Sequence, residues 1–197
     1  NHHSSVVEGR GSFEISDFNR LPDILEPKVR EPVWNLSQHA AGLTIGFRTN
    51  SNNISVKYKL KGELAMHHMP ITGVSGLDLY AKDSDGEWMW VQGHYNFDKI
   101  VRANFSMLKP NDRYHKMGRE YKLYLPLYNA VDSLEIGLQK EAIFKPLTPR
   151  NEKPIVVYGT SIAQGACASR PGMAWTAILE RKMDRPLINM GFSGNGR

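Results

Sequence analysis

The sequence predicts a mainly β protein, a jelly-roll sandwich of antiparallel strands followed by the beginning of a parallel α/β sheet. Up to about residue 143, apolar and polar residues alternate in short segments, as in half-buried strands. Beyond residue 145 the pattern changes to a continuous apolar run and then a helical repeat. The predicted parts are therefore a sandwich over residues 1–145, a linker over 146–153 and a second domain over 154–197.

Seven segments of the first part show the alternation. In the earliest of them Leu43, Ile45 and Phe47 alternate with smaller or polar residues. The other six segments are 54–60, 77–81, 88–90, 101–105, 121–125 and 134–138. We expect one face of each strand to be apolar and the other to face water. Seven strands with no convincing helix between them need a second apolar layer, which favours a jelly-roll sandwich, with a closed barrel as the alternative.

The linker is predicted from three prolines among residues 145–154. After it, residues 155–158 form an apolar β-branched run suited to a strand buried on both faces. We expect a loop over 159–165, an amphipathic helix over 172–183 and a second buried strand over 187–190. The predicted buried stripe of that helix is Trp175, Ile178, Leu179 and Met183. Two parallel strands leave their edges uncovered, so we expect the second domain to be incomplete and the natural protein to continue.

Composition excludes a disordered chain, a disulfide-rich scaffold and a protein with a membrane-spanning helix. The chain is 41% hydrophobic, enough for a core, and its single cysteine, Cys167, cannot form an internal disulfide. Its apolar runs are much shorter than the roughly 20 residues of a membrane helix. The formal net charge of +5 is spread over the chain without a run of five like charges. We therefore expect neither a nucleic acid partner nor membrane insertion.

Two glycine-flanked loops are the candidate functional site. Ser161 follows the first strand of the second domain, so its hydroxyl is expected at the carboxyl edge of the sheet, where open α/β folds bind ligands. Ala163 excludes the Gly-x-Ser-x-Gly elbow of α/β-hydrolases, and no Gly-Lys-Ser/Thr is present to form a P-loop. Residues 191–196, Gly-Phe-Ser-Gly-Asn-Gly, follow the next strand and reach the same edge, where glycines leave N–H groups accessible to an oxyanion.

The two loops together resemble the SGNH (GDSL-type) hydrolase family. Ser161 matches the nucleophile of the first block, and Gly194, in Asn-Met-Gly-Phe-Ser-Gly, matches the oxyanion-hole glycine of the second. Thr160 stands where the family name implies aspartate. Upstream, residues 75–80, Ser-Gly-Leu-Asp-Leu-Tyr, are similar to the Gly-x-Asp-Leu-Tyr signature of a β-sandwich found before some bacterial SGNH esterase domains. Residues 30–37 and 168–172 fit the same subgroup.

The resemblance implies a flavodoxin-like second domain and a serine acylhydrolase without a cofactor or a metal. Ser161 would attack small acyl esters, with acetyl groups on carbohydrates as the expected example, and the N–H groups of Ser161 and Gly194 would hold the oxyanion. Arg170 and Asn195 are the expected substrate-binding residues. The resemblance also implies a periplasmic or secreted location and a sandwich that packs on the hydrolase domain.

The family's third-block asparagine and its late Asp-x-x-His are not present in this sequence. All histidines precede Ser161; they are His2, His3, His39, His67, His68, His94 and His115. We therefore expect this chain to be an inactive fragment of an active parent. His67 and His68 are expected to be surface residues of a loop, without the second ligand cluster that a zinc site would need.

The aromatic residues of the sandwich leave an alternative function open. Trp88 and Trp90 share one strand face and form either a platform for sugar rings or part of the core. Exposed rings would favour a carbohydrate-binding module without catalysis. A purely structural domain is the third possibility, in which Asp78 and Tyr80 pack at the junction with the hydrolase domain.

Overall fold

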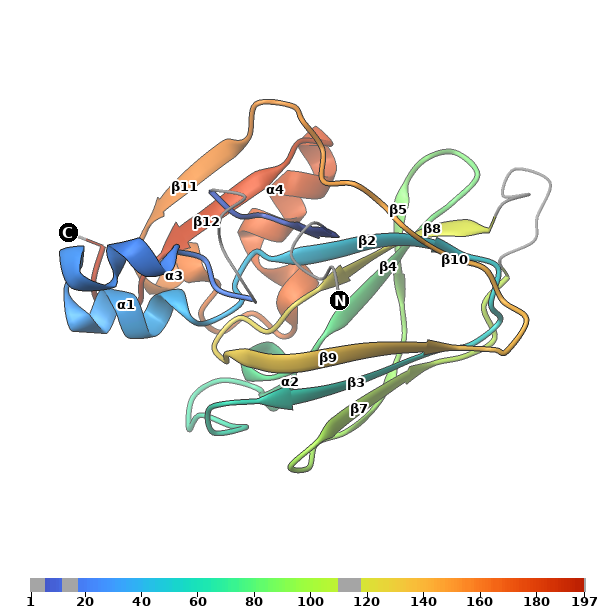
Figure 1. The fold of residues 1–197 in the computed structure, drawn as a ribbon, viewed down its shortest axis with the longest axis horizontal. Coiled ribbons are helices and arrows are strands. Elements are labelled where there is room, and N and C mark those ends of the chain that lie inside the picture. Colours follow the sequence, from blue (N-terminus) through green and yellow to red (C-terminus); the bar gives the residue numbers. More distant parts are fainter. Residues whose placement is uncertain (1–5, 12–17, 110–117, 197) are drawn as a thin grey trace.

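The computed structural model describes residues 6–11, 18–109 and 118–196, and within them it contains two antiparallel sheets and a small α/β unit (Figure 1). The strands are β1 Val7–Glu8, β2 Thr44–Thr49, β3 Ile54–Leu60, β4 Asp78–Lys82, β5 Trp88–Val91, β6 His94–Asn96, β7 Val101–Phe105, β8 Arg119–Tyr124, β9 Val131–Leu138, β10 Phe144–Pro146, β11 Ile155–Gly159 and β12 Leu187–Gly191. The helices are α1 Glu31–Ser37, α2 Ile71–Val74, α3 Ser161–Gln164 and α4 Trp175–Met183, with 3-10 helices η2 Asp23–Lys28 and η3 Pro171–Met173.

The antiparallel strands form a sandwich. One sheet has the order β1-β2-β8-β4-β5, with β10 also paired to β2, and the other has the order β6-β7-β3-β9. All seven predicted strands are present, as β2 to β5 and β7 to β9. The described strands form two separate sheets and not one barrel, so the sandwich is confirmed, while its jelly-roll connectivity stays a prediction. The short strands β1, β6 and β10 were not predicted.

The seven predicted strands were expected without a convincing helix between them, and of the helices in the described residues only α2, a single turn of four residues, lies between two of these strands. η2 and α1 precede β2 and lie beside the α/β unit (Figure 1). A glutamate and a proline occupy the first turn of α1. The negative charge of the glutamate interacts favourably with the positive end of the helix dipole, and the N–H that proline lacks would have no partner within the helix at this position. With seven residues, α1 is too short for a recognisable apolar period.

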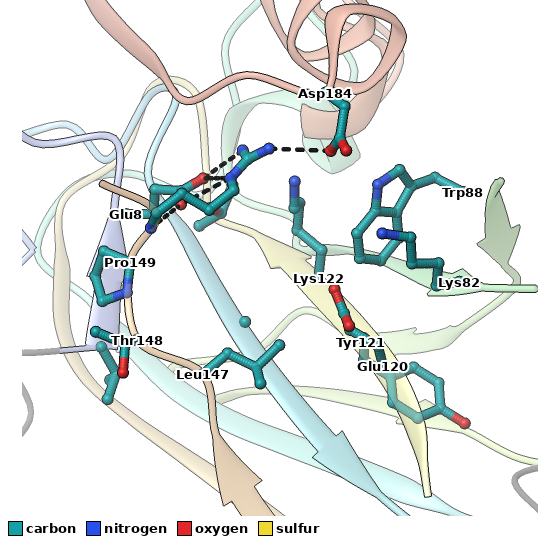
Figure 2. A pocket seen from close by; sticks show the side chains of 14 residues that line it. Glu8, Lys82, Trp88, Glu120, Tyr121, Lys122, Leu147, Thr148, Pro149 and Asp184 are labelled. Carbon is teal, nitrogen blue, oxygen red and sulfur yellow. Dashed lines mark hydrogen bonds and ion pairs between the residues drawn. The ribbon is translucent and has the colours of Figure 1, made fainter. Parts of the chain in front are cut away.

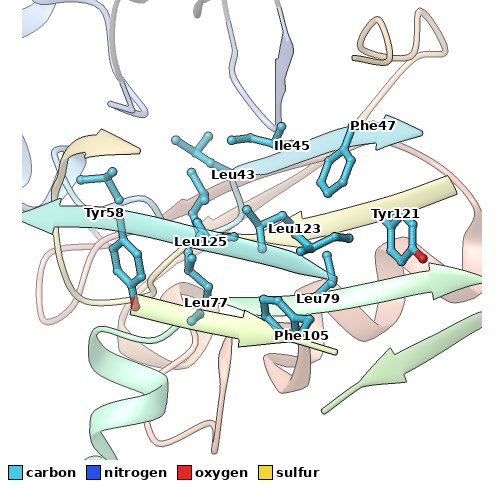
Figure 3. Close-up of a cluster of buried hydrophobic side chains, with 14 of the residues drawn as sticks. Leu43, Ile45, Phe47, Tyr58, Leu77, Leu79, Phe105, Tyr121, Leu123 and Leu125 are labelled. Carbon is cyan, nitrogen blue, oxygen red and sulfur yellow. The ribbon is translucent and has the colours of Figure 1, made fainter. Parts of the chain in front are cut away.

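The hydrophobic core lies between the two sheets (Figure 3). Phe47 of β2 and Tyr121 of β8 stack with ring centroids 5.6 Å apart, and Leu123 and Leu79 continue this layer. From the opposite sheet, Tyr58 enters the core and donates a hydrogen bond through its hydroxyl to the Ser75 carbonyl, at 2.8 Å. Its polar end is thereby satisfied at the margin of the apolar layer.

The neighbouring strands β8 and β4 of the larger sheet are covered on both faces, which corrects the prediction of one solvent-facing side per strand. In β3 of the smaller sheet the alternation holds, with buried and exposed residues in turn. In β8, by contrast, Lys122 and Tyr124 point away from the core and are nevertheless buried, because Glu180 of α4 packs against them. The α/β unit occupies this outer face (Figure 1).

The α/β unit differs from the prediction in three respects. β11 and β12 pair in parallel as expected, but Val156 and Tyr158 are each 61% exposed, so β11 is not buried on both faces. The predicted loop over 159–165 contains α3. The predicted helix over 172–183 is divided at Ala174, whose extended ψ separates η3 from α4.

The predicted stripe of α4 is also wrong. Trp175 and Met183 are exposed, while Ile178 and Leu179 are only partly buried. The buried face of α4 consists instead of Thr176, Ala177 and Glu180. This side of the helix faces the polar outer surface of the larger sheet. Small and charged side chains, and not large apolar ones, therefore form the buried face of α4.

The linker is packed against the sandwich. Of the predicted linker 146–153, Pro146 belongs to β10, while residues 147–153 contain neither helix nor strand, as expected. The Leu147 N–H donates to the Gly46 carbonyl at 2.9 Å. Arg150 ion-pairs with Glu8, whose strand β1 pairs with β2. No helix in the described residues is long and apolar enough to cross a membrane.

Replacing Leu123 with alanine tests the core. The side chain is fully buried between the sheets, so Leu123→Ala is expected to lower the free energy of unfolding by about 2–5 kcal/mol. Urea unfolding measures the change. As a control, Glu135→Ala on the exposed side of β9 should change it by less than about 0.5 kcal/mol. Equal effects of the two substitutions would contradict the assignment of the core.

Candidate active site

Ser161 lies at the carboxyl end of β11, as the first residue of α3. It is partly buried, and its carbonyl accepts a hydrogen bond from Gly165 N–H at 3.0 Å. Gly165 has a φ of 110°, and a Cβ there would lie 3.1 Å from side-chain atoms of Ala174 and Leu127. A glycine at this position therefore allows the chain to leave α3 sharply while the sandwich stays close.

The second glycine-flanked loop meets the first, as the sequence predicted. Phe192 N–H donates to the Gly159 carbonyl at 2.9 Å, and a Cβ on Gly196 would lie 2.6 Å from the Gly159 carbonyl carbon. Gly194 is exposed, has a φ of 69°, and has open space where a Cβ would project. The loop is thus held at its base while Gly194 stays accessible.

The backbone N–H groups of the two loops differ in whether they have partners. Gly191 N–H donates to Asn189 Oδ1 at 2.9 Å, and Ser193 N–H donates to Gln164 Oε1 at 3.0 Å. For Ser161 and Gly194, no hydrogen bond of the backbone N–H occurs within the described residues. The sequence resemblance implies these two groups as oxyanion donors, and that role stays a prediction.

Gln164 is a buried site residue that sequence reasoning missed. Its amide nitrogen lies 3.2 Å from both the Leu127 carbonyl and His39 Nδ1, while its oxygen accepts from Ser193 N–H. The side chain therefore joins α3, the sandwich and the second loop. The available signal was a polar residue close after the candidate nucleophile, since a buried amide needs partners for both of its ends.

His39 approaches this site from the segment that precedes β2. Burial, and secondarily the charge of Arg20, lower the pKa of His39 to about 4, so the ring is neutral near pH 7. Because the Gln164 amide donates to Nδ1, we assign the ring proton to Nε2. No histidine in the described part of the chain hydrogen-bonds the Ser161 hydroxyl.

The remaining histidines do not form a metal site in the described residues. His67 and His68 are exposed, as predicted, in a turn closed by a bridge between Met66 and Met69. The Cys167 Sγ lies 3.8 Å from the His68 carbonyl, so this turn reaches the loop after α3. The histidines at 2, 3 and 115 lie outside the described residues.

The Gly-x-Asp-Leu-Tyr segment lies at the contact between the sandwich and the α/β unit. Asp78 is fully buried; it accepts from the Trp90 indole at 2.7 Å and Gly172 N–H at 3.0 Å, and pairs with Arg170 Nε at 3.1 Å. Tyr80 hydroxyl lies 3.4 Å from the Gly172 carbonyl. The motif thereby fixes residues 170–172 on the sandwich.

Arg170 and Asn195, the predicted substrate-binding residues, both have structural partners. Arg170 pairs with Asp78 and its guanidinium carbon lies 4.3 Å from the centre of the Trp90 ring. Asn195 accepts two hydrogen bonds from Arg30, at 2.9 Å through its side chain and 3.1 Å through its carbonyl. Their contact with substrate stays a prediction.

Trp88 and Trp90 belong to the outer face of the larger sheet and not to its core. Trp88 has the ammonium groups of Lys82 and Lys122 at 5.3 and 4.7 Å from its ring centre. Trp90 is 44% exposed, with Arg170 over its ring. Since cations already lie against both rings, the geometry gives no support to a sugar platform.

A second polar contact joins the two parts beside a cleft of about 140 Å³ (Figure 2). Glu180 of α4 binds Lys122 at 2.5 Å and pairs with Arg150, which also binds Glu8 and Asp184. Burial lowers the pKa of Lys122, and the carboxylate of Glu180 offsets part of that effect. Each buried charge here has a partner of opposite sign, as burial requires.

Comparisons with known proteins agree with both halves of the chain. The family model of the N-terminal domain of SGNH-hydrolase-type esterases, named for its GxDLY motif, matches residues 1–144, and that of the GDSL-like lipase/acylhydrolase family matches residues 152–197. No curated protein matches the chain.

Two solved structures are similar to it. A GDSL-like lipase from Bacteroides ovatus shares 34% identity with a TM-score of 0.87, over 98% of this chain and 56% of that protein. The salicylyl-acyltransferase SsfX3 of a tetracycline biosynthetic pathway shares 16% identity with a TM-score of 0.68, over 96% of this chain and 52% of that protein. The chain thus spans little more than half the length of each.

Asp78 is expected to make stability depend on pH. Burial outweighs Arg170, Trp90 and Gly172 and raises the pKa of Asp78 from 3.8 to about 6. The folded protein keeps this proton to higher pH than the unfolded chain does. The contribution of Asp78 to the free energy of unfolding is therefore fully present below pH 3.8 and is lost as pH rises through 6. The decline amounts to about 3 kcal/mol, at 1.36 kcal/mol per pKa unit.

Urea unfolding at pH 4, 5, 6 and 7 gives the free energy of unfolding of the wild type and of Asp78→Asn. The decline is measured as the change with pH in the difference between these two free energies. Asparagine does not titrate, so the variant should lack the decline. Asp132→Asn, which removes a partly exposed carboxylate on β9, is the control and should keep it. Parallel curves for the wild type and Asp78→Asn would refute the prediction.

Proposed function

Because the chain belongs to the SGNH-hydrolase-type esterases with a GxDLY N-terminal domain, we propose that its natural protein is a serine acylhydrolase with Ser161 as the nucleophile. The observation that carries this proposal is that the loops bearing Ser161 and Gly194 meet at the carboxyl edge of the parallel sheet, where the backbone N–H groups of both residues have no hydrogen-bond partner within the described residues. Unpaired N–H donors beside the nucleophile are what stabilisation of a tetrahedral oxyanion requires.

The proposed reaction proceeds through an acyl-enzyme. The Ser161 hydroxyl oxygen forms a bond to the ester carbonyl carbon, its proton passes to a base, and the carbonyl oxygen becomes an anion held by the two N–H groups. Collapse of this intermediate releases the alcohol, which takes up the proton. Water then attacks the acyl group by the same route and frees Ser161.

The base is proposed to come from the natural protein outside this sequence. In the family it is the histidine of a late Asp-x-x-His block, and this sequence contains no such block. His39 is a poor substitute, because a ring with a pKa near 4 attracts a proton weakly at neutral pH. The substrates proposed are small acyl esters, including acetyl groups on carbohydrates, and the proposed location is periplasmic or secreted.

Ser161→Ala in the full-length natural protein is expected to reduce turnover of 4-nitrophenyl acetate by at least about 10³-fold, since no other group would form the acyl-enzyme. The control is Ser169→Ala, which removes an exposed hydroxyl from the loop after α3 and should leave turnover within about threefold. Comparable turnover by wild type and Ser161→Ala would exclude this nucleophile. In the same assay, acetyl esters should be preferred over octanoyl esters.

The 197-residue chain by itself is expected to show no turnover above the uncatalysed rate. Its described residues include the proposed nucleophile and the proposed oxyanion donors, but no histidine among them hydrogen-bonds the Ser161 hydroxyl. Purified chain, with its folding verified by a cooperative urea transition, is assayed on the same ester beside the full-length protein. Turnover that disappears in Ser161→Ala but persists in His39→Gln would contradict this expectation and exclude His39 as its source.

A further inference from the structure

Arg20 is a buried cation that has no carboxylate partner among the described residues. Its side chain is 2% exposed, and its guanidinium donates instead to backbone carbonyls. Nε donates to His39 at 2.9 Å and Nη2 donates to Leu36 at 2.6 Å. Nη1 donates to Asn189 at 3.0 Å and Gly191 at 2.7 Å. One side chain of the N-terminal domain therefore holds the end of β12.

The two carbonyls of β12 belong to the edge of the strand that faces away from β11. On the paired edge, the Pro186 carbonyl accepts from Ile155 N–H at 2.9 Å. Carbonyls alternate in direction along a strand, so those of Asn189 and Gly191 point to the opposite edge. There the guanidinium supplies the donors that a neighbouring strand would supply.

This edge leads directly into the loop that carries Gly194. Phe192, the first residue after β12, has the Arg20 guanidinium 5.0 Å from its ring centre. At the far end of the loop, Arg30 donates to both the side chain and the carbonyl of Asn195. The N-terminal domain thus holds the loop on both sides of Gly194, and Gly194 itself is exposed.

We propose that Arg20 is a positioning residue for the oxyanion site, fixing the end of β12 so that the Gly194 N–H is held in place before substrate binds. This inference rests on the proposed function. Preorganised donors stabilise the transition state without reorganisation during the reaction, so a shift of this loop lowers kcat more than it raises KM. The planar guanidinium of Arg20 has five N–H donors and binds four carbonyls at the same time. A lysine ammonium has only three donors, all on one nitrogen atom.

The test uses Arg20→Lys in the full-length natural protein, because lysine keeps the charge and much of the volume and is therefore compatible with folding. We expect kcat on 4-nitrophenyl acetate to fall about 10- to 100-fold while KM changes by less than about threefold. Arg150→Lys is the matched control, a similar replacement at the other contact between the two parts, and should leave kcat within about threefold. A kcat for Arg20→Lys equal to that of the control would overturn the proposal.

Amide hydrogen exchange gives a readout that does not depend on turnover. In Arg20→Lys, the hydrogen-bonded amides of residues 191, 192, 193 and 195 should exchange at least about tenfold faster than in the wild type, while those of β8 are unchanged. Unchanged exchange at these four amides would overturn the proposal even if the protein proved to have no esterase activity. An inactive wild type with faster exchange in the variant would refute the proposed function and leave the role of Arg20 in holding the loop supported.

Discussion

The burial of β4 and β8 of the larger sheet on both faces is the constraint on which the rest of the structure depends. A sandwich needs only its inner faces covered, and the smaller sheet follows that rule. The outer face of the larger sheet, however, has polar side chains such as Asp78, Lys122 and Tyr124, and the α/β unit covers them. Burying an unpaired charge costs several kcal/mol, so each of these groups needs a partner on the other part. The pairing requirements of single side chains thereby fix how the two parts meet.

The GxDLY segment shows how a short motif meets this constraint. Leu77, just before β4, and Leu79 within it enter the core. Asp78 and Tyr80 face the α/β unit, as strand alternation dictates. Gly76 precedes them where a Cβ would lie 2.4 Å from the Thr72 carbonyl oxygen. The motif therefore combines a close backbone approach, a core layer and an interface. Its residues act in packing the two parts, and the sequence-based suggestion that Asp78 and Tyr80 lie at a junction agrees with these contacts.

Sequence patterns predicted the strands and the meeting of the two loops because both depend on local periodicity. They failed where a distant segment decides burial. Period-2 alternation shows which residues of β8 share a face but not that α4 covers the second face. The apolar residues of α4 suggested the wrong stripe because that helix packs on a polar surface. Gln164 and Arg20 were missed for a related reason, since their partners lie up to 125 and 171 residues away in the sequence. The position of Gln164 shortly after Ser161 was the only local signal, and none of the residues next to Arg20 indicates its partners.

The two contacts that surround the candidate site respond differently to pH. Asp78 has a pKa raised to about 6. The contact between the sandwich and residues 170–172 therefore depends on a group that titrates near neutrality. Burial lowers the pKa of Arg20 to about 9, which still leaves it charged at every pH where a carboxylate changes state. Its partners are carbonyls, which do not titrate. The support of the loop that carries Gly194 is therefore constant over the range in which the other contact changes, because a cation held by backbone oxygens has no acidic partner to lose.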